Sequence, residues 1–329
     1  MYIGIDWGGT KMEVVGLDAG GVELCRHRIP TPREDYDASI RAVVDLVEHV
    51  EKATCQSGSV GIGLPGSPNP LTGLIRNSNT FWLNGQPLGR DLEAALGRPV
   101  RLANDGNCLA VSEAIDGAGA GLDVVVGIIL GTGHGGGIAL KGKSHAGFQG
   151  LAGEIGHYSL PWPKEGEYPG PKCWCGRSGC LEMFCSGTGF ELDYKTTTGI
   201  ARKASEVIDL KRAGDPTATA VYGRYVDRLA RSLALIIDLI DPDVFVLGGG
   251  MSNVDELYTD VPKLLSTRTN LWDGEAAGSG DGRLVFSDSV ATPIRKAKHG
   301  DSSGVRGAAF LWKEDGEKSS NKRSFLQRA

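Results

Sequence analysis

The chain has 329 residues, of which 40% are hydrophobic and 23% are charged, a composition typical of a soluble globular protein with two domains. Its formal net charge of −5 gives no general attraction to nucleic acid or to an anionic membrane. The apolar run at residues 124–130 is too short to cross a bilayer, and charged residues stand where a secretion signal would begin. We therefore expect a cytoplasmic protein with no nucleic-acid or membrane partner.

Alternating apolar runs and turn residues predict an α/β chain. The expected elements of the first part are strands at residues 2–6, 12–17 and 22–29, a helix with its apolar face over 40–50, a strand at 60–64, a short helix at 91–96, a strand at 100–103 and a helix at 107–115. A strand at 124–130, a glycine-rich turn and a second strand at 138–140 follow. Strand, glycine turn and strand thus occur at 3–15 and again at 125–140, which suggests two domains of similar topology.

The second part of the chain predicts fewer elements. They are a long helix that begins at Asp215 and Pro216, a strand at 243–247, a helix at 254–265, a loose glycine-rich loop at 274–282, a strand at 284–287 and a closing helix at 303–312. The last residues are charged and rich in serine, and we expect them to be disordered.

One histidine and three cysteines stand close together in the sequence and predict a zinc site. They are His157, Cys173, Cys175 and Cys180. These residue types close a tetrahedral structural site that leaves no position for water, so we expect the metal to build a wall of a binding site without taking part in chemistry. A cysteine-rich loop without metal, or a redox pair at Cys173 and Cys175, remains an alternative.

Three glycine-rich turns are candidates for nucleotide binding. The first consists of Gly8, Gly9, Thr10 and Lys11, whose backbone amides, hydroxyl and ammonium suit a phosphate. Asp6, just before it, is suited to hold Mg²⁺ through water. A plain hairpin turn is the alternative.

The second turn, which includes Gly131, Thr132 and Gly133, matches the dinucleotide pattern G-x-G-x-x-G. An apolar, β-branched segment follows it instead of a helix, so we interpret it as a second phosphate clamp. Its His134 is expected either to contact phosphate or to be solvated. The third turn, with Gly249 and Gly250, ends a buried strand, where adenine could pack on the backbone.

Asp105 stands where a predicted strand meets a predicted helix, and it has two interpretations. It is either a helix cap or a base that accepts the proton of an attacking hydroxyl. An unperturbed Asp, with a pKa of about 3.9, is a weak base at pH 7, which suits phosphoryl transfer because positioning dominates its catalysis. Together with Glu154, His157 and Glu182, it would form a polar pocket for sugar hydroxyls.

With these motifs in view, the chain resembles the ROK family of bacterial sugar kinases, which has the two-domain actin-like ATPase (ribonuclease H-like) fold. The motifs lie at residues 4–11, 102–105, 131–137, 153–157, 173–182 and 247–250. The segments at 84–87, 160–162, 241–244 and 295–307 further resemble bacterial manno(fructo)kinases, also called fructokinases.

The resemblance implies ATP-dependent phosphorylation of fructose, and of mannose as a further substrate, at the 6-hydroxyl, with Mg²⁺ as catalytic and Zn²⁺ as structural metal. It makes Asp105 the catalytic base and assigns sugar binding to Gly66, Asn79, Asn104, Asp105, Glu154, His157 and Glu182. Family members commonly have Ala where this chain has Gly106, which loosens the helix start by up to about 1 kcal/mol. We also expect a homodimer, with an active-site cleft between the domains.

The expected domains are a small one at 1–118, completed by the helix at 301–314, and a large one at 119–300 that carries the zinc site, with a tail at 315–329. Kinases for glucose or for an N-acetylhexosamine are alternative functions. A sugar-responsive ROK transcriptional regulator is disfavoured, because the first strand begins at residue 2 and leaves no room for a preceding helix-turn-helix. A zinc-ribbon binding module would leave the phosphate turns unexplained.

Overall fold

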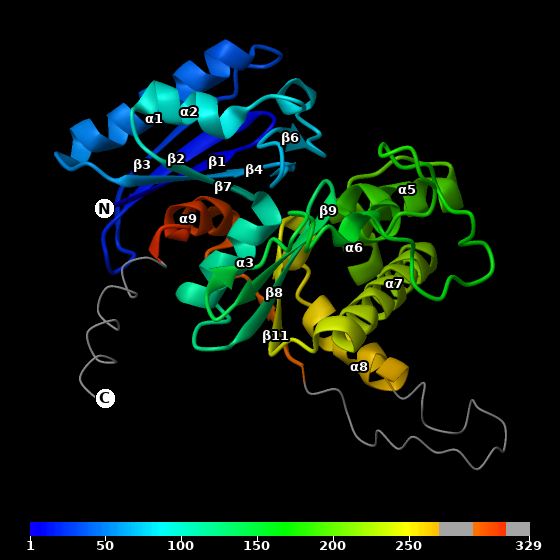
Figure 1. The fold of residues 1–329 in the computed structure, drawn as a ribbon. Helices are drawn as coiled ribbons and strands as arrows, with labels where there is room; N and C mark the ends of the chain where they lie inside the picture. The colour runs from blue at the N-terminus through cyan, green and yellow to red at the C-terminus, as the bar shows by residue number, and fades with distance from the viewer. Residues whose placement is uncertain (270–291, 314–329) are drawn as a thin grey trace. The chain divides into compact units, whose positions relative to one another are not determined.

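The computed structural model describes residues 1–269 and 292–313 (Figure 1). It divides into two compact units: unit 1 contains residues 1–127, 137–153 and the chain from 298 onward, and unit 2 contains residues 128–136 and 154–297. The glycine-rich loop expected at 274–282, the strand expected at 284–287 and the expected tail at 315–329 lie outside the described residues. The domain boundaries expected from the sequence stay a prediction.

Unit 1 is built on a five-stranded sheet of order β3-β2-β1-β4-β7. Its strands are β1 (Tyr2–Trp7), β2 (Lys11–Leu17), β3 (Glu23–Pro30), β4 (Ser59–Leu64) and β7 (Val100–Asn104). The first three, which were expected as strands, form an antiparallel meander, and β4 and β7 continue the sheet in parallel. The carboxyl ends of β1, β4 and β7 therefore meet at one edge of the sheet, and parallel sheets place functional residues at that edge.

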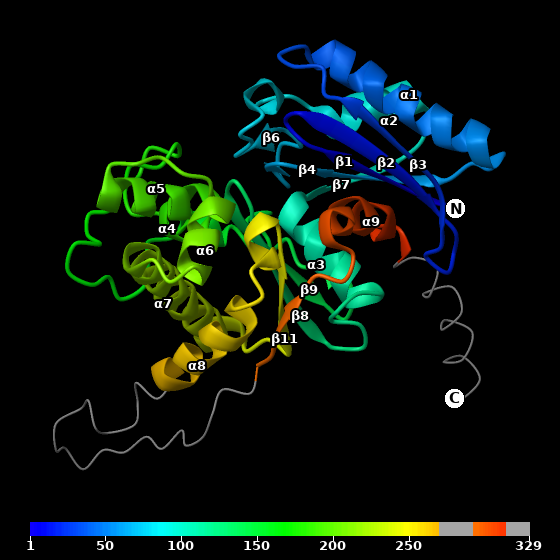
Figure 2. The same cartoon turned by 180° about the vertical axis from the view of Figure 1, so that it is seen from behind.

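Helices cover both faces of this sheet, as the two views show (Figures 1 and 2). On one face, α1 (Tyr36–Thr54) and α2 (Leu88–Leu96) bury Val43, Val47 and Leu92 in a common core with the strands. On the other face lie α3 (Asp105–Ile115) and α9 (Ser303–Phe310). Segments from both ends of the chain thus belong to one unit.

Glycines allow α9 to approach the sheet at backbone distance. A Cβ on Gly4 of β1 would lie 2.0 Å from the carbonyl oxygen of Val305, and one on Gly61 of β4 would lie 2.0 Å from that of Ala308. Real Cβ contacts are not that short, so any side chain at these positions would push the helix away from the sheet.

The second sheet has the order β10-β9-β8-β11-β12. Its strands are β8 (Val124–Leu130), β9 (His134–Leu140), β10 (Lys143–Ser144), β11 (Val244–Gly248) and β12 (Ile294–Lys296). The helices of unit 2 are α4 (Glu182–Cys185), α5 (Gly187–Thr198), α6 (Ala204–Arg212), α7 (Pro216–Ile240) and α8 (Leu257–Thr269). The long helix α7 begins as predicted, because Asp215 caps it and accepts from the amide of Ala218 at 2.7 Å.

The predicted α/β architecture is confirmed, and the errors are local. The hairpin of β5 (Ser67–Pro68) and β6 (Ile75–Arg76), the strands β10 and β12, and the helices α4, α5 and α6 were not predicted. The helix expected from residue 107 begins at Asp105, and the one expected from 254 begins at Leu257. Among the described residues, no helix combines the length and the apolar character that crossing a bilayer requires.

Candidate functional site

The first glycine turn joins β1 to β2 in unit 1. The amide of Gly8 donates to the carbonyl of Lys11 at 2.9 Å, and the hydroxyl of Thr31 donates to the carbonyl of Gly8 at 2.6 Å. The first bond closes the turn within the hairpin, and the second ties the turn to Thr31, the residue that follows β3. The side chains of Thr10 and Lys11 are exposed, as a phosphate-binding turn requires.

Two carboxylates of unit 1, Asp6 at the end of β1 and Asp105 at the start of α3, interact electrostatically. Burial, and to a smaller extent the negative charge of Asp105, raises the pKa of Asp6 to about 7. Burial also raises the pKa of Asp105, against the lowering effect of a hydrogen bond from the amide of Gly106. The unperturbed pKa assumed for Asp105 from the sequence was therefore wrong. A raised value brings a carboxylate closer to the working range of a general base.

The cap of α3 is Asn104, so Asp105 is not required in that role. The amide of Gly106 donates at 2.8 Å to the side-chain oxygen of Asn104 and at 2.8 Å to a carboxylate oxygen of Asp105. The Asn104 amide group also donates to the carbonyl of Gly66 at 3.3 Å. The structure thereby brings together three of the predicted sugar-binding residues: Gly66, Asn104 and Asp105.

Hydrogen bonds between Asn84 and Ser78 hold the loop that carries Asn79. Asn84 accepts from the amide of Ser78 at 3.0 Å and donates to its carbonyl at 2.8 Å. Asn79 itself is exposed, whereas the following Thr80 is buried. The side chain of Asn79 is thus available to a ligand, while its neighbours hold the loop.

The predicted metal ligands of unit 2 come together. One ligand atom from each of His157, Cys173, Cys175 and Cys180 lies within 4.8 Å of the others. The sulfurs of Cys175 and Cys180 are 3.5 Å apart, and Cys173 Sγ is 3.7 Å from His157 Nδ1. A tetrahedron with Zn–S bonds of about 2.3 Å has edges of about 3.8 Å, so the donor set fits zinc.

Glu182, at the start of α4, lies beside this cluster. One carboxylate oxygen accepts from the indole N–H of Trp174 at 2.7 Å, and the other accepts from the amide of His134 at 3.1 Å. A Cβ on Gly133 would lie 2.6 Å from that second oxygen. Gly133, which was assigned to phosphate from the sequence, therefore also makes room for a predicted sugar-binding carboxylate.

His134 is buried, so the expectation of a solvated turn residue was wrong, and contact with phosphate stays a prediction. Its side chain is only 4% exposed, and burial lowers its pKa to about 4. The imidazole is therefore neutral near pH 7 and brings no positive charge to the turn. The close approach of Gly156, whose Cβ would lie 1.9 Å from the carbonyl oxygen of His134, packs this part of the turn against the 3₁₀ helix Ile155–His157.

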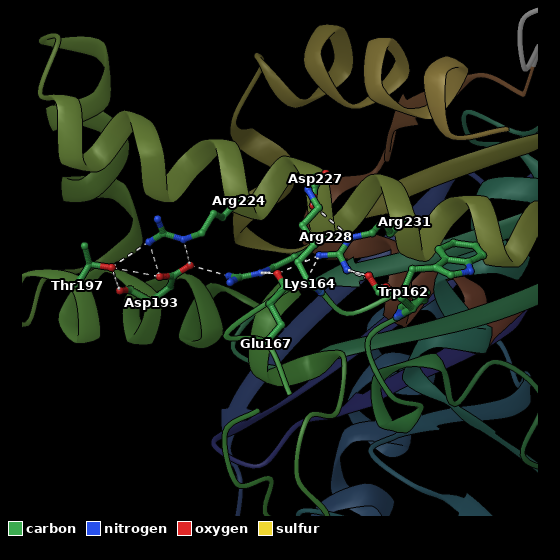
Figure 3. Close-up of polar contacts among 10 residues, drawn as sticks. Trp162, Lys164, Glu167, Asp193, Thr197, Arg224, Asp227, Arg228 and Arg231 are labelled. Carbon is green, nitrogen blue, oxygen red and sulfur yellow. Dashed lines mark hydrogen bonds and ion pairs between the residues drawn. The ribbon is translucent and has the colours of Figure 1, made fainter. Parts of the chain in front are cut away.

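Ion pairs hold the chain that leads into the cysteine loop against α7 and α5 (Figure 3). The fully buried Arg231 donates to the carbonyls of Pro161 and Trp162 at 2.8 and 2.6 Å and to both oxygens of Glu167. Arg228 bridges Glu167 and Asp193, at 2.8 and 2.6 Å. A buried pair of this kind costs about 3–5 kcal/mol when one partner is removed, so residues 161–167 are firmly anchored.

A cavity of about 680 Å³ opens in unit 2 beside the second and third glycine turns. Gly131, Thr132 and Gly250 line it as predicted, and Gly249 lies behind them, because its Cβ would meet the carbonyl oxygen of Leu130 at 2.7 Å. The sequence analysis missed its other lining residues, which include Gly187, Thr188, Lys203 and Arg212. Most of them lie on α5 and α6, which were not predicted.

Comparisons with known proteins identify the family to which the chain belongs. The model of the ROK family matches residues 2–315. The chain is 40% identical over 320 residues to an N-acetyl-D-glucosamine kinase of Haemophilus influenzae, which covers 95% of this chain and 99% of that protein. An N-acetyl-D-glucosamine kinase of Mannheimia succiniciproducens is also 40% identical over 320 residues, which are 95% of this chain and 99% of that protein.

Solved structures show the same fold. The ROK hexokinase from Thermus thermophilus has a TM-score of 0.81 and 30% identity over 96% of this chain and 99% of that one. A ROK family glucokinase from Streptomyces griseus, solved in complex with glucose and AMPPNP, has a TM-score of 0.73 and 27% identity over 95% and 99%. With a family model spanning almost its whole length and these relatives, the chain belongs to the ROK family.

Proposed function

We propose that this chain is an ATP-dependent sugar kinase and that its acceptor is N-acetyl-D-glucosamine. The observation that carries the proposal is the 40% identity to N-acetyl-D-glucosamine kinases along 95% of the chain. The glucokinase solved with glucose and AMPPNP supports the coarser part of the proposal, a sugar and a nucleotide as the two substrates.

The residues of unit 1 suit the transfer step. Asp105 accepts the proton of the attacking sugar hydroxyl, and its raised pKa makes it a stronger base than an ordinary aspartate. Asp6, beside the first glycine turn, is the candidate for holding Mg²⁺ through water, which would neutralise charge on the phosphates. Asn104 caps α3 and thereby holds Asp105 at the helix start.

The residues of unit 2 suit binding. Glu154, His157 and Glu182 are the proposed sugar contacts, and the cavity lined by Gly131, Thr132 and Gly250 is the proposed nucleotide site. Zinc on His157 and the three cysteines would fix the loop that carries Glu182, because a site with four protein ligands has no open position.

The comparisons favour the amino sugar over the fructose and mannose expected from the sequence. The segment at 84–87 contributed to the expectation of a fructokinase, yet it has a structural role. Asn84 holds Ser78, the amide of Gly85 donates to the carbonyl of Ile75 at 2.8 Å, and the carbonyl of Gln86 accepts from the amide of Ile75 at 3.0 Å. A segment that fastens a loop carries no direct information about the sugar.

A coupled assay with MgATP and a panel of N-acetyl-D-glucosamine, fructose, mannose and glucose tests the proposal. We expect kcat/KM for N-acetyl-D-glucosamine to exceed the others by at least about tenfold, since a buried group matched to a substrate discriminates by about that much or more. A higher value for fructose would return the assignment to fructokinase, and no turnover of any sugar would refute the kinase. A homodimer stays a prediction, which light scattering would check.

A further inference from the structure

Trp174 links the metal loop to two residues of the proposed sugar site. It stands between the zinc ligands Cys173 and Cys175, and its side chain is 49% exposed. Its indole N–H donates to Glu182 at 2.7 Å. Its ring meets His157 edge-on, with centroids 5.0 Å apart and an interplanar angle of 82°. Although half of this large aromatic side chain is exposed, its N–H and its ring thus both contact residues of the proposed sugar site.

Glu182 is held from both ends of its carboxylate. Trp174 occupies one oxygen, and the amide of His134 occupies the other at 3.1 Å. The absence of a side chain at Gly133 lets the second oxygen approach the turn, since a Cβ there would be 2.6 Å away. An ionised carboxylate offers about four acceptor positions, so two remain, and their directions are fixed.

We propose that Trp174 is a positioning residue that determines sugar affinity and selectivity by orienting the Glu182 carboxylate and the His157 ring. The inference rests on the proposed function, in which both residues contact the sugar. A carboxylate with only two acceptor directions left binds a sugar best when the hydroxyl groups of that sugar lie along these directions. Without the indole N–H, the carboxylate rotates about its last side-chain bond, and the acceptor directions are no longer fixed before the sugar binds.

The zinc ligands alone do not perform this task. Cys173 Sγ lies 3.8 Å from the same oxygen of Glu182, and a metal-bound thiolate has no proton to donate. With Cys173 bound to metal as a thiolate, the indole N–H of Trp174 remains as the donor to this oxygen among the described contacts. Trp174 belongs to the metal loop, so a rigid loop holds its indole N–H in place. The N–H in turn fixes the orientation of the Glu182 carboxylate.

The test compares Trp174→Phe, which keeps a ring and removes the N–H donor, with the wild-type zinc-loaded protein. The matched control is Trp162→Phe, because Trp162 is 45% exposed on the preceding loop and contacts Arg231 through its backbone carbonyl. We expect Trp174→Phe to raise KM and Kd for the sugar by roughly tenfold, in line with loss of a hydrogen bond to a charged group. KM for ATP and the zinc content should not change, and Trp162→Phe should match the wild type.

A double-mutant cycle with Glu182→Gln separates positioning from general damage. If Trp174 acts through Glu182, adding Trp174→Phe to Glu182→Gln lowers sugar affinity by less than about twofold. An equal loss in both backgrounds overturns the proposal, and so does loss of zinc from Trp174→Phe, because the residue would then support the metal. The proposed function is tested separately by turnover of the wild-type protein, and absence of any sugar binding there would refute both.

Discussion

At the scale of single residues, the chemistry of unit 1 depends on how Asp6 and Asp105 share one partly buried region. Burial raises both pKa values, and the negative charge of Asp105 further disfavours ionisation of Asp6. Two carboxylates near each other in low dielectric titrate over a wider range than isolated ones. Cation binding or proton uptake at Asp6 would therefore change the environment of Asp105, the proposed base.

Replacement of Asp105 by Asn should remove the base and keep the shape of the side chain. We expect kcat to fall by about 10²–10⁴-fold, the usual contribution of a general base, while sugar affinity changes by less than about threefold. Steady-state kinetics and calorimetric titration measure the two quantities. Asp37→Asn, at an exposed position of α1, is the control. A kcat within tenfold of the wild type would contradict the assigned role.

The raised pKa of Asp6 predicts a pH-dependent effect on stability. Its pKa is 3.8 in the absence of perturbation and about 7 in the fold, so between these values the folded protein binds more protons than the unfolded chain. Stability therefore falls as pH rises through this window, by up to about 1.4 kcal/mol per pH unit. Above pH 7 Asp6 is ionised in the folded protein as well, and the folded state keeps the full free-energy cost of burying this charge.

Asp6→Asn removes this cost, so the variant should be more stable than the wild type at pH 8 and gain little at pH 4. Urea unfolding without nucleotide or Mg²⁺, at several pH values, measures the difference. A difference independent of pH would show that Asp6 has an ordinary pKa in the folded protein. Activity should be lost in the same variant if Asp6 holds Mg²⁺.

At the scale of elements, the cysteine loop shows what the sequence predicted well. The ligand types and their spacing predicted a cluster, and the structure brings the four ligand atoms together. Gly176 has a positive φ of 89°, and its amide donates to the carbonyl of Cys173 at 3.0 Å. A local turn of this kind is encoded by neighbouring residues, so a sequence pattern suffices to predict it.

Cys175→Ser should remove zinc and weaken sugar binding, because a serine hydroxyl replaces the thiolate that zinc requires. Metal analysis and calorimetry with the preferred sugar measure both effects. Cys55→Ser, at an exposed position outside the cluster, should keep zinc and sugar affinity. Unchanged sugar affinity in a zinc-free Cys175→Ser protein would separate the metal from the binding site.

Elements with few apolar residues escaped prediction. Helix α5 buries only Gly189, Phe190 and Tyr194, which is too sparse to give a helical period. It lines the cavity with α6, so the sequence analysis missed that half of the candidate nucleotide site.

The burial of His134 was missed for a different reason. It depends on Gly156 and Glu182, which are distant in sequence, and no local sequence pattern indicates such contacts.

At the scale of the whole molecule, the C-terminal segment completes the first unit of the chain. Glu113 of α3 is fully buried, and its carboxylate accepts from the amide of Lys298 at 3.0 Å and from the hydroxyl of Ser303 at 2.8 Å. Helix α9 also lies at backbone distance from β1 and β4, through Gly4 and Gly61. These contacts join residues that lie from 185 to about 300 positions apart, so the core of unit 1 includes segments from both halves of the chain.

A chain that ends at residue 297 should therefore fail to fold unit 1. Truncation exposes the face of the sheet that α9 covers and removes the Lys298 and Ser303 donors from the buried Glu113, which keeps the amide of Ala118 at 2.8 Å. Loss of hydrogen bonds to a buried charge costs several kcal/mol. Limited proteolysis followed by mass spectrometry should show rapid cleavage within residues 1–127, whereas a chain that ends at Lys313 should keep the protection and thermal midpoint of the full-length protein. The variant Ser303→Ala tests the polar contact alone, with an expected loss of about 1–3 kcal/mol in urea unfolding. Protection of residues 1–127 in the chain that ends at 297 would show that the first sheet folds without α9.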